Sequence, residues 1–442
     1  MLRSMFSGVS GLRTHQTKMD VIGNNIANVN TVGFKASRAT FQEIYNQTLK
    51  AASAPTSAEG RGGINAQQVG LGVSVASIDV LHTQGGAQRT DKATDLALEG
   101  DGFFVLSDGV SNFYTRAGNF DVDPQGYLVS ASGLKVQGWT NRNADGEIIT
   151  TGSTNELNLT NLSMPPRATS RLRFEGNLDS SLDENGSVEY TTDIVDSLGD
   201  EHNIKLVFSR VTETYIDEDG DEQTRIVPNQ WHLAIESADA NGTITNTVLY
   251  DTSDSATFPG AGPIQFDGNG RLIHPLEGIV IPNIDFSNGA ESIEDLNIEF
   301  DHDKLTQNNN ESTFKIAYSD GYLYGTLSNI TIDSLGRVIG IYSNGQARTD
   351  AVLAIARFSN PAGLSKLGDN LFEISSNSGE PMIGRAGIDG RATINPGALE
   401  MSNVDLAREF TDMITTQRGF QANSRVITTS DELLQELVNL KR

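Results

Sequence analysis

The segment Met19–Lys35, "MDVIGNNIANVNTVGFK", decides how the first part of this 442-residue chain folds. It begins with apolar residues at helical spacing and continues with four asparagines and two glycines. It carries no charged side chain between Asp20 and Lys35. A core helix rarely holds so many amides, and a helix in water usually carries charge. The segment therefore needs a protein surface to pack against.

The heptad rhythm of this segment extends back to the start of the chain and returns at the other end. The steps between apolar or permissive residues alternate between three and four, which predicts two long helices. Ser402 is the expected N-cap of the second helix. The first series is Leu2, Met5, Val9, Leu12, Gln16, Met19, Gly23 and Ile26. The second series is Leu406, Phe410, Met413, Gln417, Phe420, Ser424, Ile427, Asp431, Leu434 and Val438.

Two interpretations of these helices stay open. They can be ordinary amphipathic helices on a globular core, or a coiled-coil-like pair that also packs with copies of itself. Polar residues at several heptad positions weaken a seam made by two helices alone, and they suit an assembly of many helices. These positions are Gln16, Gly23, Gln417, Ser424 and Asp431.

The rest of the chain predicts a mixed α and β, multidomain protein. Short apolar runs alternate with Asp-Gly, Asn and Pro-Gln-Gly turns, which is typical of hairpins and barrel-like sheets. We expect hinge-like linkers at Leu49–Gly70 and Thr393–Gly397. The expected parts are a helical domain of residues 1–35 with 400–442, a linker or extended arm of 36–74, a first β domain of 75–165 with 346–399, and an acidic outer β domain of 166–345.

Charge is distributed unevenly along the chain. The formal net charge is −25, and residues 166–345 hold 10 Lys and Arg against 31 Asp and Glu, a net of −21. Such a charge argues against nucleic acid and against anionic membranes as partners. The near-neutral ends and acidic middle indicate that the ends face protein while the middle faces water.

The residues predict no catalytic, cofactor or metal site. There are no cysteines, so disulfides, thiolate catalysis and Cys-ligated metals are excluded. The acidic run Asp217–Glu222 lacks the glycine and glutamate of a calcium loop and is expected to be a hairpin turn. The "GDGFF" stretch at Gly100–Phe104 is expected to be another hairpin turn, not a nucleotide loop. The six histidines have no metal-site spacing: His15, His82, His202, His232, His274 and His302.

No apolar run is long enough to cross a membrane, and the N-terminus does not have the pattern of a cleavable signal peptide. If the protein is exported, we therefore expect a route that leaves its N-terminus in place.

Three stretches resemble the family of bacterial flagellar rod and hook proteins. "SGLRTHQTKMDVIGNNIANVNTVGFKASRATF" is similar to the N-terminal signature of that family. "ALEGDGFFVLSDGVSNFYTRAGNFDVDPQGYLVSASGLKVQGW" looks like its first β domain, and "GALEMSNVDLAREFTDMITTQRGFQANSRVITTSDELLQELVNLKR" resembles its C-terminal helix. The long middle, with "DIVDSLGDEHNIKLVFSRV", resembles the extra β domain of the hook members.

The resemblance implies a structural, non-enzymatic subunit of the curved tubular hook, the flexible joint that transmits torque from rod to filament. It implies partners: many copies of the same chain, the rod, the hook cap, the hook–filament junction proteins and the type III export apparatus. It implies an extracellular place in the flagellum, no cofactor, and a possible export signal at Phe41 and Tyr45. The expected interface residues are Leu2, Met5, Val9, Leu12, Met19, Asn24, Asn25, Ile26, Asn28, Gly33, Phe34, Leu406, Phe410, Met413, Phe420, Ile427, Leu434 and Val438.

Two alternatives are kept in view. Another axial protein of the distal-rod type has similar ends but a much shorter middle. An extracellular acidic β-rich binding protein explains the middle but not the terminal helices. Loss of self-assembly after removal of residues 1–30 would separate the axial proteins from a binding module.

Overall fold

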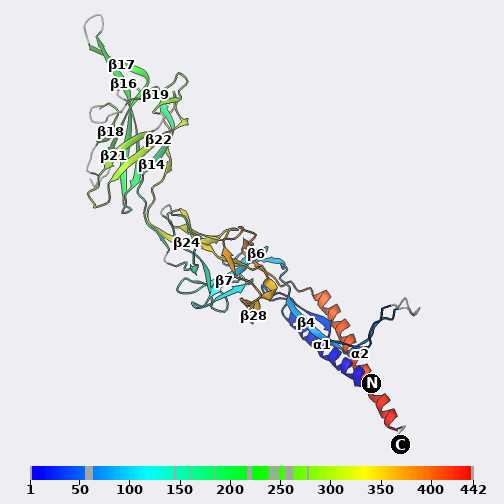
Figure 1. Ribbon diagram of the computed structural model, residues 1–442. Helices are drawn as coiled ribbons and strands as arrows, with labels where there is room; N and C mark the ends of the chain where they lie inside the picture. The colour runs from blue at the N-terminus through cyan, green and yellow to red at the C-terminus, as the bar shows by residue number, and fades with distance from the viewer. Residues whose placement is uncertain are drawn as a thin grey trace. The chain divides into compact units, whose positions relative to one another are not determined.

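The computed structural model describes residues 2–54, 63–143, 146–160, 162–184, 186–216, 222–237, 244, 248–253, 262–275 and 278–439. The chain forms two compact units. Unit 1 comprises Met1–Asn161, Asn329–Ile341 and Ala347–Arg442, and unit 2 comprises Leu162–Ser328 and Tyr342–Gln346. Figure 1 shows the helices and the first strands in unit 1, and the long strands of unit 2.

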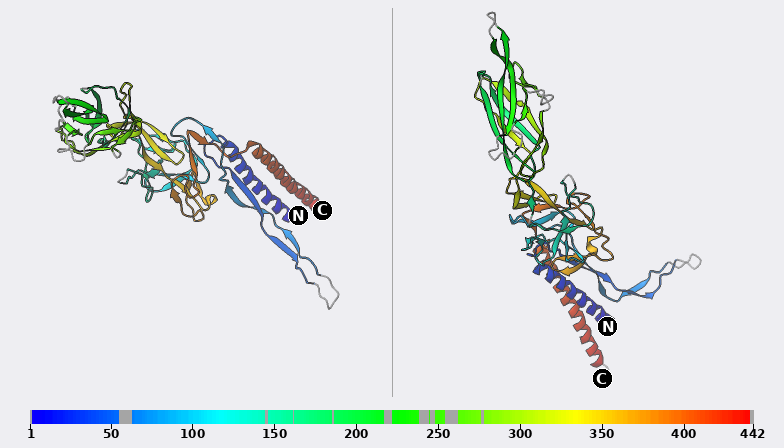
Figure 2. Two further views of the ribbon diagram at one scale, coloured as in Figure 1. Left: turned by 90° about the horizontal axis from the view of Figure 1, so that it is seen from above. Right: turned by 90° about the vertical axis from the view of Figure 1, so that its left-hand side faces the viewer.

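Unit 1 holds both helices, α1 (Leu2–Ala27) and α2 (Leu406–Asn439), side by side in all views (Figures 1 and 2). The expected pair of terminal helices is therefore confirmed. Helix α2 begins later than Ser402 because Asp405 is its N-cap. The Asp405 carboxylate accepts hydrogen bonds from the backbone N–H of Ala407 and Arg408, at 2.9 and 3.4 Å. Ser402 instead accepts from the N–H of Val404, before the helix.

The segment expected to be a linker or extended arm contains two paired strand sets. Strand β1 (Ser37–Glu43) pairs antiparallel with β4 (Val73–Val80), and β2 (Asn46–Lys50) pairs with β3 (Gln67–Gly70). The arm is therefore a β ribbon through most of its described length. The second predicted hinge, Thr393–Gly397, is wrong, because β31 (Thr393–Pro396) pairs with β6 (Leu96–Glu99) over four residues.

The β body of unit 1 is built around two buried clusters of apolar side chains, one centred on Phe104 and the other on Phe103. Successive residues of β7 point to opposite faces and so serve different clusters. Its remaining strands are β5 (Ala87–Arg89), β7 (Phe103–Ser107), β8 (Asn112–Thr115), β9 (Asp121–Val122), β10 (Leu128–Val129), β11 (Lys135–Trp139), β12 (Asn155–Glu156), β26 (Ala347–Leu353), β27 (Ile355–Arg357), β28 (Ser365–Gly368), β29 (Leu371–Glu373), β30 (Met382–Gly384) and β32 (Ala398–Glu400), with a 3-10 turn η1 (Pro361–Gly363).

One predicted turn of this body is wrong. Residues Gly100–Gly102 do not close a hairpin, because β6 pairs with β31 whereas β7 pairs with β8, β11 and β27. The stretch links two sheets instead. A side chain at Gly102 would meet Ile355 at 2.7 Å, so the glycine permits close packing there.

Unit 2 is built of two sheets around one apolar core, in which Trp231 and Phe174 are fully buried. Four apolar runs of the middle region, at His202–Val211, Asn229–Ser237, Leu296–Phe300 and Ser312–Ser319, lie wholly or partly in its strands. The strands of this unit are β13 (Ser163–Met164), β14 (Arg171–Asp179), β15 (Ser187–Val195), β16 (Glu201–Ile216), β17 (Glu222–Ser237), β18 (Val248–Asp251), β19 (Ile264–Phe266), β20 (Leu272–His274), β21 (Ile279–Ile284), β22 (Ile293–Asn308) and β23 (Lys315–Ser319).

The chain passes between the units within β24 (Gly325–Ile332) and β25 (Arg337–Tyr342). The acidic run Asp217–Glu222 falls almost wholly outside the described residues. The strands before and after it pair as expected, with Thr212 opposite Ile226 and Tyr215 opposite Gln223.

One local sequence pattern, Asp-x-x-Gly, makes the same turn in both units. At Asp333 the carboxylate accepts from the N–H groups of Leu335 and Arg337, at 3.0 and 2.8 Å, and Gly336 has φ +75°. Asp267 repeats this geometry in unit 2. The N–H of Arg271 is the main cause of a lowered pKa at Asp267, because it bonds the charged carboxylate. The aspartates therefore set the turns between strands.

Candidate assembly surface on the terminal helices

Helices α1 and α2 pack antiparallel through small residues. A side chain added at Gly8 would meet Ile427 at 3.2 Å, and one at Gly419 would meet the His15 ring at 2.8 Å. The missing side chains let the two backbones approach closely. Polar pairs continue the contact: the hydroxyls of Ser4 and Ser430 lie 3.4 Å apart.

The contact positions follow a heptad of their own. On α1 they are Ser4, Gly8, Gly11, His15, Lys18 and Asn25, which are spaced by four and three. Lys18 pairs with Asp412 at 3.8 Å, and the Asn25 amide donates to Glu409 at 3.3 Å. Each position lies one residue before a position of the predicted apolar series. The predicted series of α1 therefore lies about 100° further around that helix, beside the intrachain contact. On α2, Ile427 of the predicted series packs in the contact itself, against Gly8.

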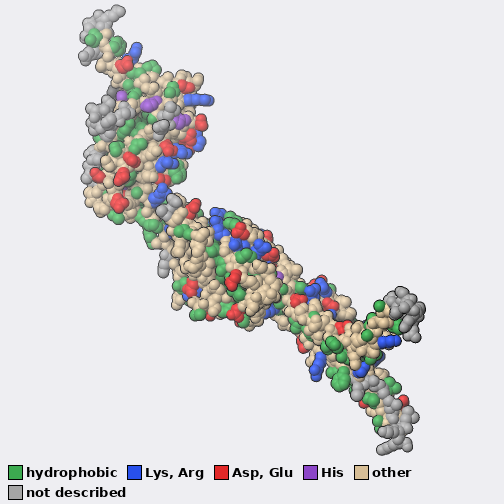
Figure 3. Space-filling view, viewed as in Figure 1, with side chains coloured by type: hydrophobic (Ala, Val, Ile, Leu, Met, Phe, Trp, Pro, Cys, Tyr) green, Lys and Arg blue, Asp and Glu red, His purple; other side chains and the backbone are tan. Residues whose placement is uncertain are grey.

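This offset leaves part of the predicted series open to solvent. Among the predicted interface residues, Val9 is 38 %, Phe410 50 % and Val438 66 % exposed. Sequence reasoning missed neighbouring apolar side chains that are equally exposed: Phe6, Ile414, Val426 and Leu433. Leu406 is also exposed, and the half-buried members are Met5, Leu12, Met19, Ile26, Met413, Phe420, Ile427 and Leu434. The side chain of Leu2 lies outside the described residues. Figure 3 shows apolar side chains at the surface of unit 1 near the helices.

Three predicted interface residues instead serve the chain itself. Asn25 is 1 % exposed; its amide donates to the carbonyl of Ser37 at 2.8 Å, and its carbonyl accepts from Ser37 N–H at 2.9 Å. Phe34 is buried under the Lys366 ammonium, 4.2 Å from the ring centre. Gly33 has φ +68°, as expected of a glycine here, and is buried against Ala117. In this conformation these residues cannot contact another copy.

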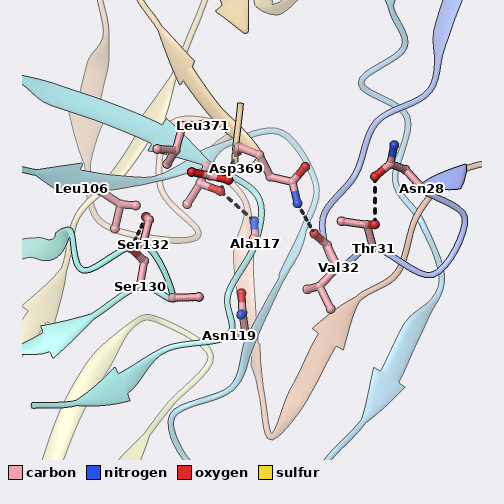
Figure 4. Close-up of a pocket in the computed structure, with 13 residues that line it drawn as sticks. Asn28, Thr31, Val32, Leu106, Ala117, Asn119, Ser130, Ser132, Asp369 and Leu371 are labelled. Carbon is pink, nitrogen blue, oxygen red and sulfur yellow. Dashed lines mark hydrogen bonds between the residues drawn. The ribbon is translucent and has the colours of Figure 1, made fainter. Parts of the chain in front are cut away.

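Asn24 and Asn28 remain accessible at the end of α1. The Asn28 amide donates to the Asn24 carbonyl at 2.9 Å and accepts from the Thr31 hydroxyl at 3.1 Å. Figure 4 shows Asn28 and Thr31 beside a cavity of about 520 Å³, whose other wall carries Leu106, Ser130 and Asp369. The Asn370 amide bonds the Val32 carbonyl across it, at 2.9 Å.

A buried ion cluster ties both ends of the chain to the β body. The Lys35 ammonium lies 2.6 Å from the Glu400 carboxylate and donates to the Thr83 carbonyl at 2.7 Å. Arg116 lies 3.5 Å from the other oxygen of Glu400. The exposed fractions of Lys35, Glu400 and Arg116 are 0, 1 and 2 %. Burial lowers the pKa of both Lys35 and Arg116, and Glu400 opposes both shifts.

His82 lies beside this cluster, with its ring against Phe103 and Phe372 at 5.5 and 5.4 Å. Burial lowers its pKa to about 4, and the charges of Arg116 and Lys35 add to the effect. Sequence reasoning missed the cluster. Lys35 was visible as the lone charge at the end of the opening segment, but nothing in the sequence pairs it with a residue 365 positions away.

The predicted export-signal residues lie on β1 and on the short connection to β2. Tyr45 is 69 % exposed, and Phe41 is 38 % exposed with its ring edge against His15, 5.6 Å between centres. Among the described residues, no group of His, Asp and Glu could hold a metal ion. No helix in the described ranges is both long and apolar enough to span a membrane.

Comparison with known families defines the class of the protein. Three family models match in chain order: "Flagella basal body rod protein" at residues 5–35, "Flagellar hook protein FlgE/F/G D1 domain" at 97–190, and "Flagellar basal body rod FlgEFG protein C-terminal" at 395–440. Paired terminal helices around a β body, with these matches, define an axial structural protein of the bacterial flagellum.

Whole-chain relatives identify the branch. The chain is 42 % identical to the flagellar hook protein FlgE of Borreliella burgdorferi and 39 % identical to that of Treponema pallidum, over 100 % of both chains in each case. It is 30 % identical to the basal-body rod protein FlgG of Bacillus subtilis, also over all of both chains. A solved structure of Helicobacter pylori FlgE2 aligns with a TM-score of 0.46 and 16 % identity, over 71 % of this chain and all of that one. The chain belongs to the flagellar hook protein FlgE family and is a structural subunit of the hook.

Proposed function

We propose that this subunit polymerises with copies of itself into a curved tube, the flexible joint that passes torque from the rod to the filament. The observation that carries the proposal is the apolar surface left open on α1 and α2 away from their mutual contact. This surface, the apolar stripe, consists of Phe6, Val9, Phe410, Ile414, Val426 and Leu433. The two helices pack on each other through glycines and polar pairs, and this contact does not cover the stripe. The stripe therefore remains available for helices of other copies.

A heterologous contact of this kind builds an open helical polymer when the rotation between copies does not close a ring. The acidic unit 2 supports the same assignment. It carries 9 Lys and Arg against 30 Asp and Glu, a net of −21, whereas unit 1 carries −4. Negative charge on an outer face keeps a polymer soluble and lets neighbouring outer units slide without sticking.

The remaining parts of the proposal rest on the family. The subunit leaves the cell through the type III export apparatus without cleavage, with Phe41 and Tyr45 as part of the signal. It meets the rod, the hook cap and the hook–filament junction proteins in the assembled, extracellular hook. Copies that cover the stripe make α1 and α2 more rigid than they are in the free subunit.

The stripe is tested with one substitution and one matched control. Ile414→Glu places a charge on the stripe, where the side chain is 53 % exposed. Gln125→Glu adds the same charge at an exposed position of unit 1 outside both helices. We expect electron microscopy to show curved tubes from the wild type and from Q125E, and none from I414E. Tubes of normal yield from I414E would refute the stripe as the interface.

The accessible amide Asn24 is a separate test. We propose that amides here change partners as copies slide, which an ion pair would resist. Asn24→Leu should give straight or short polymers, while Asn30→Leu, on an exposed residue beyond the helix, should leave them curved. Normal curved tubes from N24L would disprove this role.

A further inference from the structure

Four arginines line one cavity on the β body of unit 1. The cavity has a volume of about 370 Å³, and it lies against β25 and β26, away from the helices. Its arginines are Arg142, Arg337, Arg348 and Arg385, and its lining includes a single carboxylate, Glu147. A concentration of guanidinium groups is unexpected in a chain of net charge −25.

The neighbouring carboxylates account for three of these arginines. Asp350, 1 % exposed, accepts from Arg142 at 2.9 Å and from Arg348 at 2.8 Å. Asp333 pairs with Arg337 at 2.6 Å. These ion pairs fix the three guanidinium groups in place, and Arg142 also donates to the carbonyls of Gly146 and Thr349, at 2.9 and 2.6 Å.

Arg385 is the fourth. Within the described part of the chain no carboxylate pairs with it, and its Nε is buried without a hydrogen-bond acceptor. A buried donor without an acceptor costs about 1–3 kcal/mol. A guanidinium fork prefers a carboxylate or phosphate, which it binds with two parallel hydrogen bonds. The Arg385 guanidinium is therefore suited to an oxyanion that enters the cavity.

Unit 2 supplies such groups in its exposed acidic segment, Glu291–Asp295. Glu291, Glu294 and Asp295 are exposed, and none forms an ion pair among the described residues. The N–H of Glu291 donates to the Ser197 hydroxyl at 2.9 Å, which holds the start of the segment on the unit 2 body. The arginine cavity of unit 1 and this acidic segment of unit 2 carry opposite charges, so they are complementary between copies of a self-assembling chain.

We infer that the arginine cavity receives carboxylates of the Glu291–Asp295 segment of a second copy. The inference rests on the proposed polymerisation and adds a contact between β units to the contact between helices. The apolar stripe holds the helices together irrespective of salt. The arginine contact is electrostatic, so it weakens as salt screens it.

The test uses full-length chains and a charge exchange. Arg385→Glu alters the cavity, E294K/D295K alters the segment, and one chain carries all three changes. Arg89→Glu is the matched control, since Arg89 is in unit 1, 84 % exposed and outside the cavity. Sedimentation gives the critical concentration for polymerisation at about 0.1 M and about 1 M salt, where the Debye lengths are about 10 and 3 Å.

At about 0.1 M salt we expect R385E and E294K/D295K each to raise the critical concentration about tenfold, and the combined chain to return most of the way to wild type. At about 1 M salt the differences shrink. Identical values for R385E and R89E would overturn the inference, as would a combined chain no better than R385E. A wild-type chain that forms no polymer refutes the proposed function itself, which is a different result.

Discussion

The ion pair Lys35–Glu400 has an exposed counterpart of the same length, and this permits a controlled prediction. Lys35 and Glu400 lie 2.6 Å apart with exposed fractions of 0 and 1 %. Lys135 and Glu156 lie 2.6 Å apart with exposed fractions of 34 and 32 %. The same substitution, Glu to Gln, therefore removes the same charge at the same distance from a lysine. The two sites differ in burial and in the second cation, Arg116, beside Glu400.

Glu400→Gln leaves two buried cations, Lys35 and Arg116, without a carboxylate. Breaking a buried pair from one side costs about 3–5 kcal/mol of unfolding free energy. Lys35→Met should cost less, about 1–3 kcal/mol, because Arg116 stays 3.5 Å from Glu400 and the Gly85 N–H still donates to it at 3.0 Å. Glu156→Gln should leave stability almost unchanged, because water solvates both partners.

The assay uses the two tryptophans, one in each unit. Trp139 is buried in unit 1 and Trp231 in unit 2, so a Trp231→Phe background makes fluorescence report unit 1 alone. Urea unfolding of monomers in that background gives the change in unfolding free energy for each variant. An E400Q chain that loses no more stability than E156Q, or less than K35M, would refute the argument from burial.

Three further predictions use the same monomer. His82 has a pKa near 6.5 when unfolded and about 4 when folded, so the unfolded state holds more protons between these values. Stability should fall by up to about 3 kcal/mol as the pH drops from 6.5 to 4, and urea titrations of His82→Gln should lack this loss. Gly33→Ala adds a Cβ 2.6 Å from the Ala117 nitrogen at φ +68° and should cost more than about 2 kcal/mol. Gly133→Ala, at φ +80° with open space around it, should cost less in the same assay; equal costs would exclude the clash. Gly419→Leu should separate α2 from His15 and speed amide exchange in α2, whereas Gly23→Leu, with nothing within 4 Å, should leave exchange in α2 unchanged.

Spacing along the sequence predicted the helices well but assigned their faces poorly. Alternating steps of three and four identify residues that share one side of a helix. They do not show which partner that side meets. The intrachain contact uses glycines such as Gly8 and Gly419, which carry no apolar signal, so the more apolar neighbouring series was the visible one. Asp405 replaced Ser402 as N-cap because either residue type suits that position.

Contacts between distant segments were beyond sequence reasoning for a different reason. Hairpins such as β16–β17 join strands that are close in sequence, and the turn residues between the strands predict them. The parallel pairing of β14 with β22 joins Leu172 to Ile298, and the Lys35–Glu400 pair joins the two ends of the chain. Such contacts depend on how whole units close, and no local pattern encodes them. The predicted hinge at Thr393–Gly397 was wrong for the same reason, because β31 pairs with β6, which is distant in sequence.

The Lys35–Glu400 pair also has a consequence for the order in which the protein forms. It joins residues 365 positions apart in the sequence. The chain between them is therefore topologically an insertion between the two terminal helices, which form a stem. In a chain that emerges N-terminus first, Lys35 appears long before Glu400, its partner, has emerged. The stem must therefore be the last part to close, and changes of length within the inserted body leave the stem unaltered.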